Sequence, residues 1–198
     1  MDLSLDTIRY FLALITVISM PAWIAWIIIH PGVRFWRRLG PVATYLIVGA
    51  IVIASSAALY TQREALFALD YGANRFLWPV ALIVYGVAAF IELQCRKHLK
   101  FGTLVGMPEL AKDQSDRKLL TDGIYGRMRH PRYVGFTLGY FAVALFTNYL
   151  ASYVIVPAMI VLAWVTSVLE EKELIDVFGD EYRAYKENVP RFIPRLGS

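Results

Sequence analysis

Five long apolar segments constrain this chain more than any other feature of its sequence. A helix that crosses the hydrocarbon core of a bilayer takes about 20 residues. The expected spans are, in chain order, Ile8–Ile29, Pro41–Thr61, Phe76–Leu93, Tyr133–Leu150 and Ser152–Leu169. Hydrophobic residues make up 58% of the chain, whereas a soluble domain is about 45–50% apolar. The sequence therefore predicts an all-α integral membrane protein.

The joints within and between these spans predict how the helices are arranged. Pro21 interrupts the first span and should kink it, because proline removes a backbone hydrogen bond. The fourth and fifth spans meet at Leu150 with essentially no loop. We therefore expect a tight antiparallel hairpin, in which either helix can fall short of a full crossing. Residues 1–94 should form three transmembrane helices, and residues 95–198 should form the functional half.

The distribution of basic residues predicts the orientation of the chain. With five spans, alternate connections carry 3 and 17 of the 20 Lys and Arg residues. Loops rich in Lys and Arg stay in the cytoplasm. We expect the N-terminus outside, and the connection Cys95–Arg132 and the tail Glu170–Ser198 facing each other in the cytoplasm.

Composition also argues against several classes of protein. The basic residues lie at the ends of apolar runs rather than in one patch, so we expect no nucleic-acid partner. The single cysteine, Cys95, allows no disulfide framework, and the three scattered histidines have no metal-ligand spacing. The acidic residues Asp2 and Asp6 are untypical of a cleavable signal peptide.

A polar stretch, Leu119–Phe136, runs directly into the fourth apolar segment. Asp122–Gly123 is a turn signal, and Pro131 suits the first position of a helix. The free N–H groups at such a helix start can hold a carboxylate or a phosphate. The alternative is a basic loop that only sets the topology.

The tail after the fifth span carries a second group of polar residues. The pair Glu170–Glu171 lies at the membrane boundary, where an unpaired carboxylate is costly. It either faces a cation in a cavity, pairs with Lys172 or Arg132, or is solvated at the headgroups. Phe178–Gly179 should end the helix, and a short helix capped by Asp180 should follow, with two tyrosines on one face.

These two stretches together resemble the isoprenylcysteine carboxyl methyltransferase family, to which the phospholipid methyltransferases are related. The first pattern is G-x-Y-x-x-x-R-H-P-x-Y-x-G-F, over residues 123–136. The second is E-E-x-x-L-x-x-x-F-G-x-E-Y-x-x-Y-x-x-x-V-P-R-F-I-P, over residues 170–194. The resemblance covers about 80 residues, from Arg117 onward, and the first three helices match only in hydropathy.

The resemblance implies a membrane methyltransferase that uses S-adenosylmethionine and needs no metal. The cofactor would lie between the connection, the last hairpin and the tail, and the substrate would be a lipophilic small molecule or a membrane lipid. By motif position, the residues that would bind the cofactor are Lys118, Leu119, Leu120, Tyr125, His130, Pro131, Arg132, Tyr133 and Glu170. Arg129 and Arg191 are the cations expected to act on an anionic acceptor head. A hydrophobic acceptor should reach the site through an apolar opening at the cytoplasmic end of the spans.

Two departures from the family pattern leave the acceptor open. Thr166 stands where the prenylcysteine enzymes have an arginine for the substrate carboxylate, and Leu110 stands near the place of a glutamine that meets the cofactor. A prenylcysteine carboxylate, a lipid amine, a thiol and an isoprenoid acid all remain candidates. A membrane sterol or steroid reductase that uses NADPH shares the H-P-x-Y-x-G pattern and is the alternative function, although Phe136 and the acidic pair favour the methyltransferase. A non-catalytic membrane scaffold would leave the paired motifs unexplained.

Overall fold

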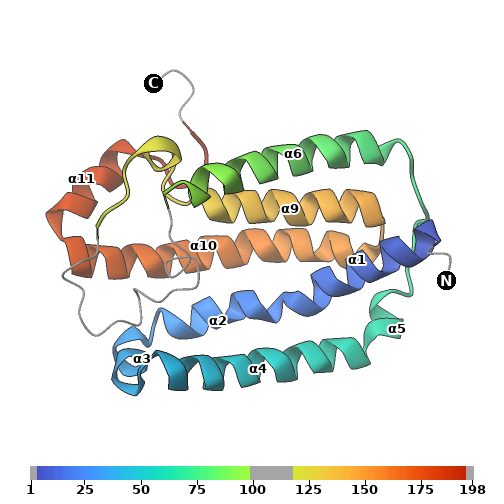
Figure 1. The fold of residues 1–198 in the computed structure, drawn as a ribbon, viewed down its shortest axis with the longest axis horizontal. Helices are drawn as coiled ribbons and strands as arrows, with labels where there is room; N and C mark the ends of the chain where they lie inside the picture. Colours follow the sequence, from blue (N-terminus) through green and yellow to red (C-terminus); the bar gives the residue numbers. More distant parts are fainter. Residues whose placement is uncertain (1–3, 99–117, 195–198) are drawn as a thin grey trace.

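The computed structural model describes residues 4–98 and 118–194, and over these residues the secondary structure is helical (Figure 1). One isolated β-bridge joins Asp70 to Tyr149. The α-helices are, in chain order, α1 (Leu5–Ser19), α2 (Pro21–Ile29), α3 (Val33–Leu39), α4 (Pro41–Thr61), α5 (Arg63–Leu66), α6 (Leu77–Arg96), α9 (Pro131–Thr147), α10 (Leu150–Phe178) and α11 (Asp180–Asn188). A short 3-10 helix, η1 (Gly123–Gly126), precedes α9.

The first predicted span is two helices, as the position of Pro21 indicated. α1 ends at Ser19, and α2 begins at Pro21, which occupies the first turn and lacks the N–H group that a continuous helix would need. Together they still form one apolar helical segment, Leu5–Ile29, that is long enough to cross a membrane. The predicted kink is therefore confirmed.

Four of the five predicted spans are helices long and apolar enough to cross a membrane. They are Leu5–Ile29, Pro41–Thr61, Leu77–Arg96 and Leu150–Phe178. The remaining prediction, Tyr133–Leu150, corresponds to α9, which has 17 residues. At 1.5 Å per residue α9 reaches about 25 Å, less than the roughly 30 Å of a bilayer core. A fifth full span is therefore not established.

The end of α9 is set by a residue that hydropathy does not reveal. Asn148 has φ 55°, in the left-handed region that commonly ends helices. Its side-chain amide donates to the Gly72 carbonyl at 2.9 Å, and its amide oxygen accepts from the Tyr153 hydroxyl at 2.9 Å. α10 begins two residues later at Leu150, so the predicted tight hairpin is confirmed.

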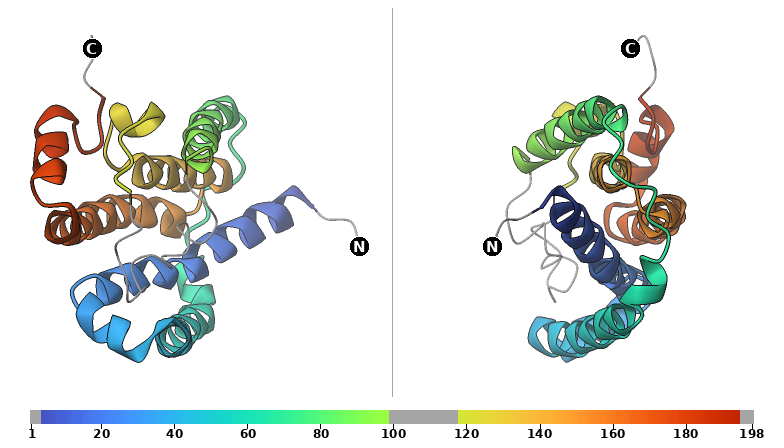
Figure 2. Two further views of the ribbon diagram at one scale, coloured as in Figure 1. Left: turned by 60° about the vertical axis from the view of Figure 1, so that its left-hand side comes forward. Right: turned by 90° about the vertical axis from the view of Figure 1, so that its right-hand side faces the viewer.

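The helices form an antiparallel bundle in which α9 lies between α6 and α10 (Figure 1). α4 lies at the opposite side of the bundle from α6, beyond α2 (Figures 1 and 2). α9 also contacts α1. Gly135 allows the close approach to α6, since a Cβ atom there would lie 3.2 Å from Cγ2 of Ile91.

A buried arginine closes the end of the bundle where α1 begins. Arg9 has 1% of its surface exposed, and its Nε donates to the Thr147 carbonyl at 3.0 Å. Its guanidinium pairs with Asp6 at 2.8 Å and with Asp70. α3, the last turn of α6, the start of α9 and α11 lie at the other end (Figure 1). The motif residues therefore gather at one end, while the orientation across the membrane stays a prediction.

Candidate functional site

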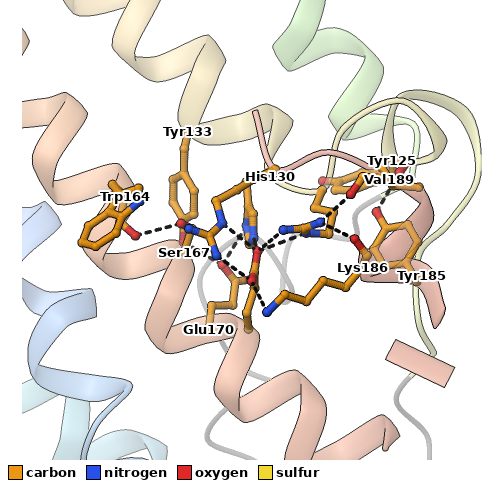
Figure 3. Close-up of polar contacts among 12 residues, drawn as sticks. Tyr125, His130, Tyr133, Trp164, Ser167, Glu170, Tyr185, Lys186 and Val189 are labelled. Atoms are coloured by element: carbon orange, nitrogen blue, oxygen red, sulfur yellow. Dashed lines mark hydrogen bonds and ion pairs between the residues drawn. The ribbon is translucent and has the colours of Figure 1, made fainter. Parts of the chain in front are cut away.

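The site is assembled where the tail crosses the start of α9 (Figure 3). Pro131 opens α9, as its sequence position predicted. The backbone before it pairs with the tail: the N–H of Arg129 donates to the Pro190 carbonyl at 2.9 Å, and that of His130 donates to the Arg191 carbonyl at 3.0 Å. These two bonds hold Pro190 and Arg191 beside the start of α9.

Glu171, at the polar end of α10, is the hub of this assembly. Its side chain is 2% exposed, and its carboxylate accepts hydrogen bonds from Arg129 at 2.9 and 3.1 Å. Arg191 donates to both carboxylate oxygens, at 2.9 and 2.8 Å, and the Lys186 amine lies 3.3 Å away. A carboxylate this deeply buried requires paired charges and hydrogen bonds. Glu171 therefore fastens α9, α11 and the tail together.

His130 bridges the two glutamates. Its Nε2 lies 3.2 Å from Glu171, and its Nδ1 lies 3.4 Å from Glu170. Burial by itself would lower the pKa of His130, but the hydrogen bonds and charges of the two carboxylates outweigh it and raise that pKa above its usual value. The two carboxylates therefore favour the protonated form of the imidazole.

Tyr133 completes the group on the other side of His130. Its ring stacks on the imidazole, with centroids 5.5 Å apart, and its hydroxyl donates to Glu170 at 2.9 Å. The Glu170 side chain is 29% exposed, far more than that of Glu171. Glu170 therefore presents a carboxylate, beside an aromatic face, that a bound cation can reach.

The two tyrosines of α11 lie on one buried face of the helix, as predicted. Tyr182, Tyr185 and Val189 form a buried cluster against which Leu119 packs. The Tyr185 hydroxyl donates to the Tyr125 carbonyl at 2.6 Å, and burial raises the pKa of Tyr185 to about 12. The predicted cap at Asp180 is wrong, because Gly179 occupies the cap position and Asp180 is the first helical residue.

The sequence-predicted site residues fall into two groups in the structure. His130, Tyr133 and Glu170 touch one another, and Pro131 is buried beside them. Tyr125 contributes its backbone to the tail, and Leu119 its side chain. Of the others, Lys118 is exposed, Leu120 is partly exposed, and Arg132 lies over the ring of Phe136 at 5.3 Å. Leu110 lies outside the described residues.

The predicted catalytic pair, Arg129 and Arg191, already has a partner within the chain. Both guanidiniums bind Glu171, so each is already engaged within the chain. Pairing of the acidic residues with Lys172 or Arg132 is not observed among the described ion pairs, and Lys172 is exposed. Sequence reasoning singled out Glu170 and missed Glu171 as the hub, although both stand in the E-E motif.

A second buried carboxylate, Glu173, ties the N-terminal helices to the same end of α10. It lies 3.1 Å from Nδ1 of His30 and 2.7 Å from the guanidinium of Arg37. His30 follows α2, and Arg37 lies on α3. No motif pointed to this cluster, because Glu173 is more than 130 positions from both His30 and Arg37 in the chain.

An apolar cavity of about 530 Å³ lies between α1, α6 and α9. Ala88, Gly135 and Phe136 line its wall, while Ile15 and Tyr85 are 59% and 58% exposed on the outer surface of the bundle. Its polar end carries the pair Glu92–Arg96, at 3.0 Å, and lies beside the start of α9. Trp23 of α2 contacts both Phe136 and Tyr133 edge-on, at 4.8 and 5.9 Å. The rings of Phe136 and Trp23 thus connect the cavity to Tyr133, which belongs to the group with Glu170 and His130.

Four apolar helices long enough to cross a membrane indicate a multi-pass membrane protein, and its charged assembly lies at one end of the bundle. The model of the family described as phospholipid methyltransferase matches residues 75–181, more than half of the chain. The chain belongs to this family.

Curated relatives carry related names. The chain is 36% identical over 86 residues to methanethiol S-methyltransferase 1 of Bradyrhizobium diazoefficiens, and the aligned residues cover 43% of this chain and 29% of that protein. It is 32% identical over 177 residues to methanethiol S-methyltransferase of Pseudomonas deceptionensis, covering 82% and 64%. It is 38% identical over 93 residues to protein-S-isoprenylcysteine O-methyltransferase of Schizosaccharomyces pombe, covering 43% and 37%. The chain thus spans less than two thirds of the length of each. No solved structure matches.

The family assignment agrees with the resemblance seen in the two motifs. The relatives named above are methyltransferases, and they give no support to the reductase alternative. The matched residues 75–181 contain α10, which carries the two glutamates, and α6 and α9, which form two of the three walls of the cavity.

Proposed function

We propose that this protein transfers a methyl group from S-adenosylmethionine to a lipophilic or amphiphilic acceptor at the membrane boundary. The single observation that carries the proposal is the group of Glu170, His130 and Tyr133 at the end of α10. It lies within the part of the chain that matches the family.

The chemistry of this group fits the cofactor. S-adenosylmethionine carries an ammonium and a sulfonium, and Glu170 offers a partly exposed carboxylate beside the Tyr133 ring, which attracts cations. The cofactor also carries a carboxylate, which suits the free N–H groups at the start of α9. When bound, it supplies an activated methyl group, which the lone pair of the acceptor takes as the carbon–sulfur bond breaks.

The protein would orient the cofactor and the acceptor and exclude water from the site. Glu171 and its cations hold the tail over the start of α9, which fixes His130 between the glutamates. His130 and Tyr133 in turn fix the rotamer of Glu170. Alignment of this kind and a water-poor site account for rate enhancement where the acceptor itself is the nucleophile and no metal is needed.

The cavity between α1, α6 and α9 supports a lipophilic acceptor. Its volume of about 530 Å³ lies within the roughly 300–1,000 Å³ of typical ligand sites. Its lining is predominantly apolar, and exposed residues of α1 and α6 border it on the lipid-facing side. A hydrophobic acceptor would reach the polar group from the bilayer, as the sequence led us to expect.

Calorimetry with the purified protein tests the proposal. We expect S-adenosylmethionine to bind and NADPH not to bind. Glu170→Gln should weaken binding by about 2–4 kcal/mol, because it removes the carboxylate that would pair with the cationic cofactor. His130→Ala should also weaken binding, because Glu170 loses a contact that orients it. Glu181→Gln, an exposed carboxylate on α11, is the matched control and should bind normally. Wild-type affinity in both site variants would defeat the proposal.

A further inference from the structure

Thr166 carries a buried hydroxyl group that the site described above does not use. The residue is 0% exposed, and its Oγ1 atom has no hydrogen-bond partner in the structure. A buried polar atom without a partner is uncommon in folded proteins and calls for an explanation. Thr166 lies on α10 one helical turn before Glu170, which places the unpaired hydroxyl next to the candidate site.

The other threonines in the described helices all have partners for their hydroxyls. A threonine in a helix commonly donates to the backbone carbonyl three or four residues earlier. The Thr7 hydroxyl, in the first turn of α1, instead bonds that of Ser4 at 2.8 Å. Bonds to the preceding turn, at 2.7–2.8 Å, are made by Thr16, Thr44, Thr61, Thr137 and Thr147. Among the helical threonines that the structure describes, Thr166 is therefore the exception.

Helix geometry directs Thr166 toward α9 and α2. Successive residues of a helix are 100° apart, so Thr166 points about 40° from Glu170 and about 20° from Glu173, in a direction between the two. Glu170 bonds Tyr133 of α9, and Glu173 contacts His30 at the end of α2. Thr166 therefore faces the interface that α10 forms with these two helices.

The Thr166 hydroxyl lies deeper in the bundle than the charged assembly. Four residues of helix span about 6 Å, and the next buried residues on this face of α10, Ala163 and Met159, are apolar. Long side chains of a helix lean back over the turn before them, so the Glu170 side chain covers the turn that holds Thr166. A group bound at this hydroxyl is therefore adjacent to whatever Glu170 binds, and its surroundings are apolar.

These surroundings select against an anionic ligand at Thr166. Moving a charge into an apolar environment is costly, and Glu170 would repel a second negative charge. The arginines of the assembly contact Glu171, whose side chain is directed about 100° away from that of Glu170. A hydroxyl both donates and accepts hydrogen bonds, so it can bind an uncharged polar group of either kind.

We propose that the Thr166 hydroxyl binds the head group of the methyl acceptor and that this head group is uncharged when it binds. The inference rests on the proposed function, since it assigns the acceptor end of the same site. Of the candidate acceptors, a thiol or an unprotonated amine meets this requirement, whereas a prenylcysteine carboxylate or an ionised isoprenoid acid does not. Thr166 is thus a specificity-determining residue.

Two ligands with the same chain and different heads test the assignment without requiring turnover. Dodecanamide and dodecanoate are titrated against the purified protein in detergent micelles, with calorimetry as the readout. The wild type should bind the amide about 10–100-fold more tightly, because the carboxylate meets the charge of Glu170. Thr166→Val should weaken amide binding about 5–10-fold, the effect of one neutral hydrogen bond. Thr166→Ser keeps the hydroxyl and should retain most of the affinity.

Thr44→Val is the matched control, because Thr44 is equally buried but its hydroxyl donates to the Gly40 carbonyl. This change should lower the Tm and leave amide binding unchanged. Thr166→Val should leave the Tm unchanged or raise it, since it removes a buried hydroxyl that has no partner. A lowered Tm in Thr166→Val together with wild-type amide affinity would overturn the inference, because the hydroxyl would then serve the fold.

Binding of S-adenosylmethionine separates this inference from the proposed function. Thr166→Val should bind the cofactor as tightly as the wild type does. Equal binding of the amide and the carboxylate by the wild type would overturn the inference. So would a loss of cofactor affinity in Thr166→Val with amide affinity preserved, since Thr166 would then be a cofactor residue. A wild type with the expected amide preference but no affinity for S-adenosylmethionine would overturn the proposed function and leave the head-group site standing.

Discussion

Glu171→Gln should loosen the tail from the start of α9 while leaving the helices of the bundle in place. The substitution preserves the shape of the side chain and removes the charge that Arg129, His130, Lys186 and Arg191 share. Glutamine keeps one acceptor oxygen, but it cannot compensate the cations that remain.

The size of the effect follows from how deeply each partner is buried. The side chains of Glu171 and Arg129 are 2% and 7% exposed, so their pairing is poorly screened by water. Arg191 is 24% exposed and Lys186 is 41% exposed, so they contribute less. Removing one partner of a buried ion pair costs about 3–5 kcal/mol. Because glutamine retains an acceptor, we expect the lower end, about 3 kcal/mol.

Thermal unfolding of the purified protein in detergent measures this change. A loss of about 3 kcal/mol should lower the Tm by roughly 6–12 °C if the chain unfolds as one unit. Limited proteolysis should cut the tail of Glu171→Gln before the rest of the chain. Glu181→Gln, an exposed change on α11, should stay within about 0.5 kcal/mol of the wild type. The reasoning fails if the two variants unfold alike and their tails are cut at equal rates.

Three further predictions concern pH, the opposite end of the bundle and topology. The raised pKa of His130 stabilises the folded state below about pH 6.5, and this stabilisation is lost as the pH rises through the raised value. His130→Gln should therefore lower the Tm most at acidic pH and least at alkaline pH. A Tm difference that stays constant from pH 6 to 9 would contradict this. Asp70→Asn should destabilise the protein by about 1–3 kcal/mol, since it leaves the buried Arg9 short of a partner. Asp6→Asn, at a side chain that is 77% exposed, should cost less, and calorimetric unfolding compares the two. Reporter fusions should show the N-terminus outside the cell and the C-terminus in the cytoplasm; a cytoplasmic N-terminus would refute the orientation inferred from the basic residues.

The sequence by itself determined the elements that depend on local properties. Hydropathy located the spans, because burial of apolar side chains in a bilayer requires long apolar runs. Pro21, Pro131 and Gly179 marked helix boundaries correctly, since each acts through its own backbone geometry. The paired motifs indicated the family, and they also brought His130, Tyr133 and Glu170 into one hypothesis.

Only the tertiary structure decided which charges meet. Glu170 and Glu171 are adjacent in the chain, but successive residues of a helix point about 100° apart, so the first faces Tyr133 and the second receives the arginines. The pairing of Arg9 with Asp70 joins residues 61 positions apart, and no periodic pattern encodes it. The length of α9 likewise depended on Asn148, whose left-handed conformation is held by Gly72 across the bundle end. Ion-pair partners are set by distance in space after the helices pack, and a single sequence records only which charges are available.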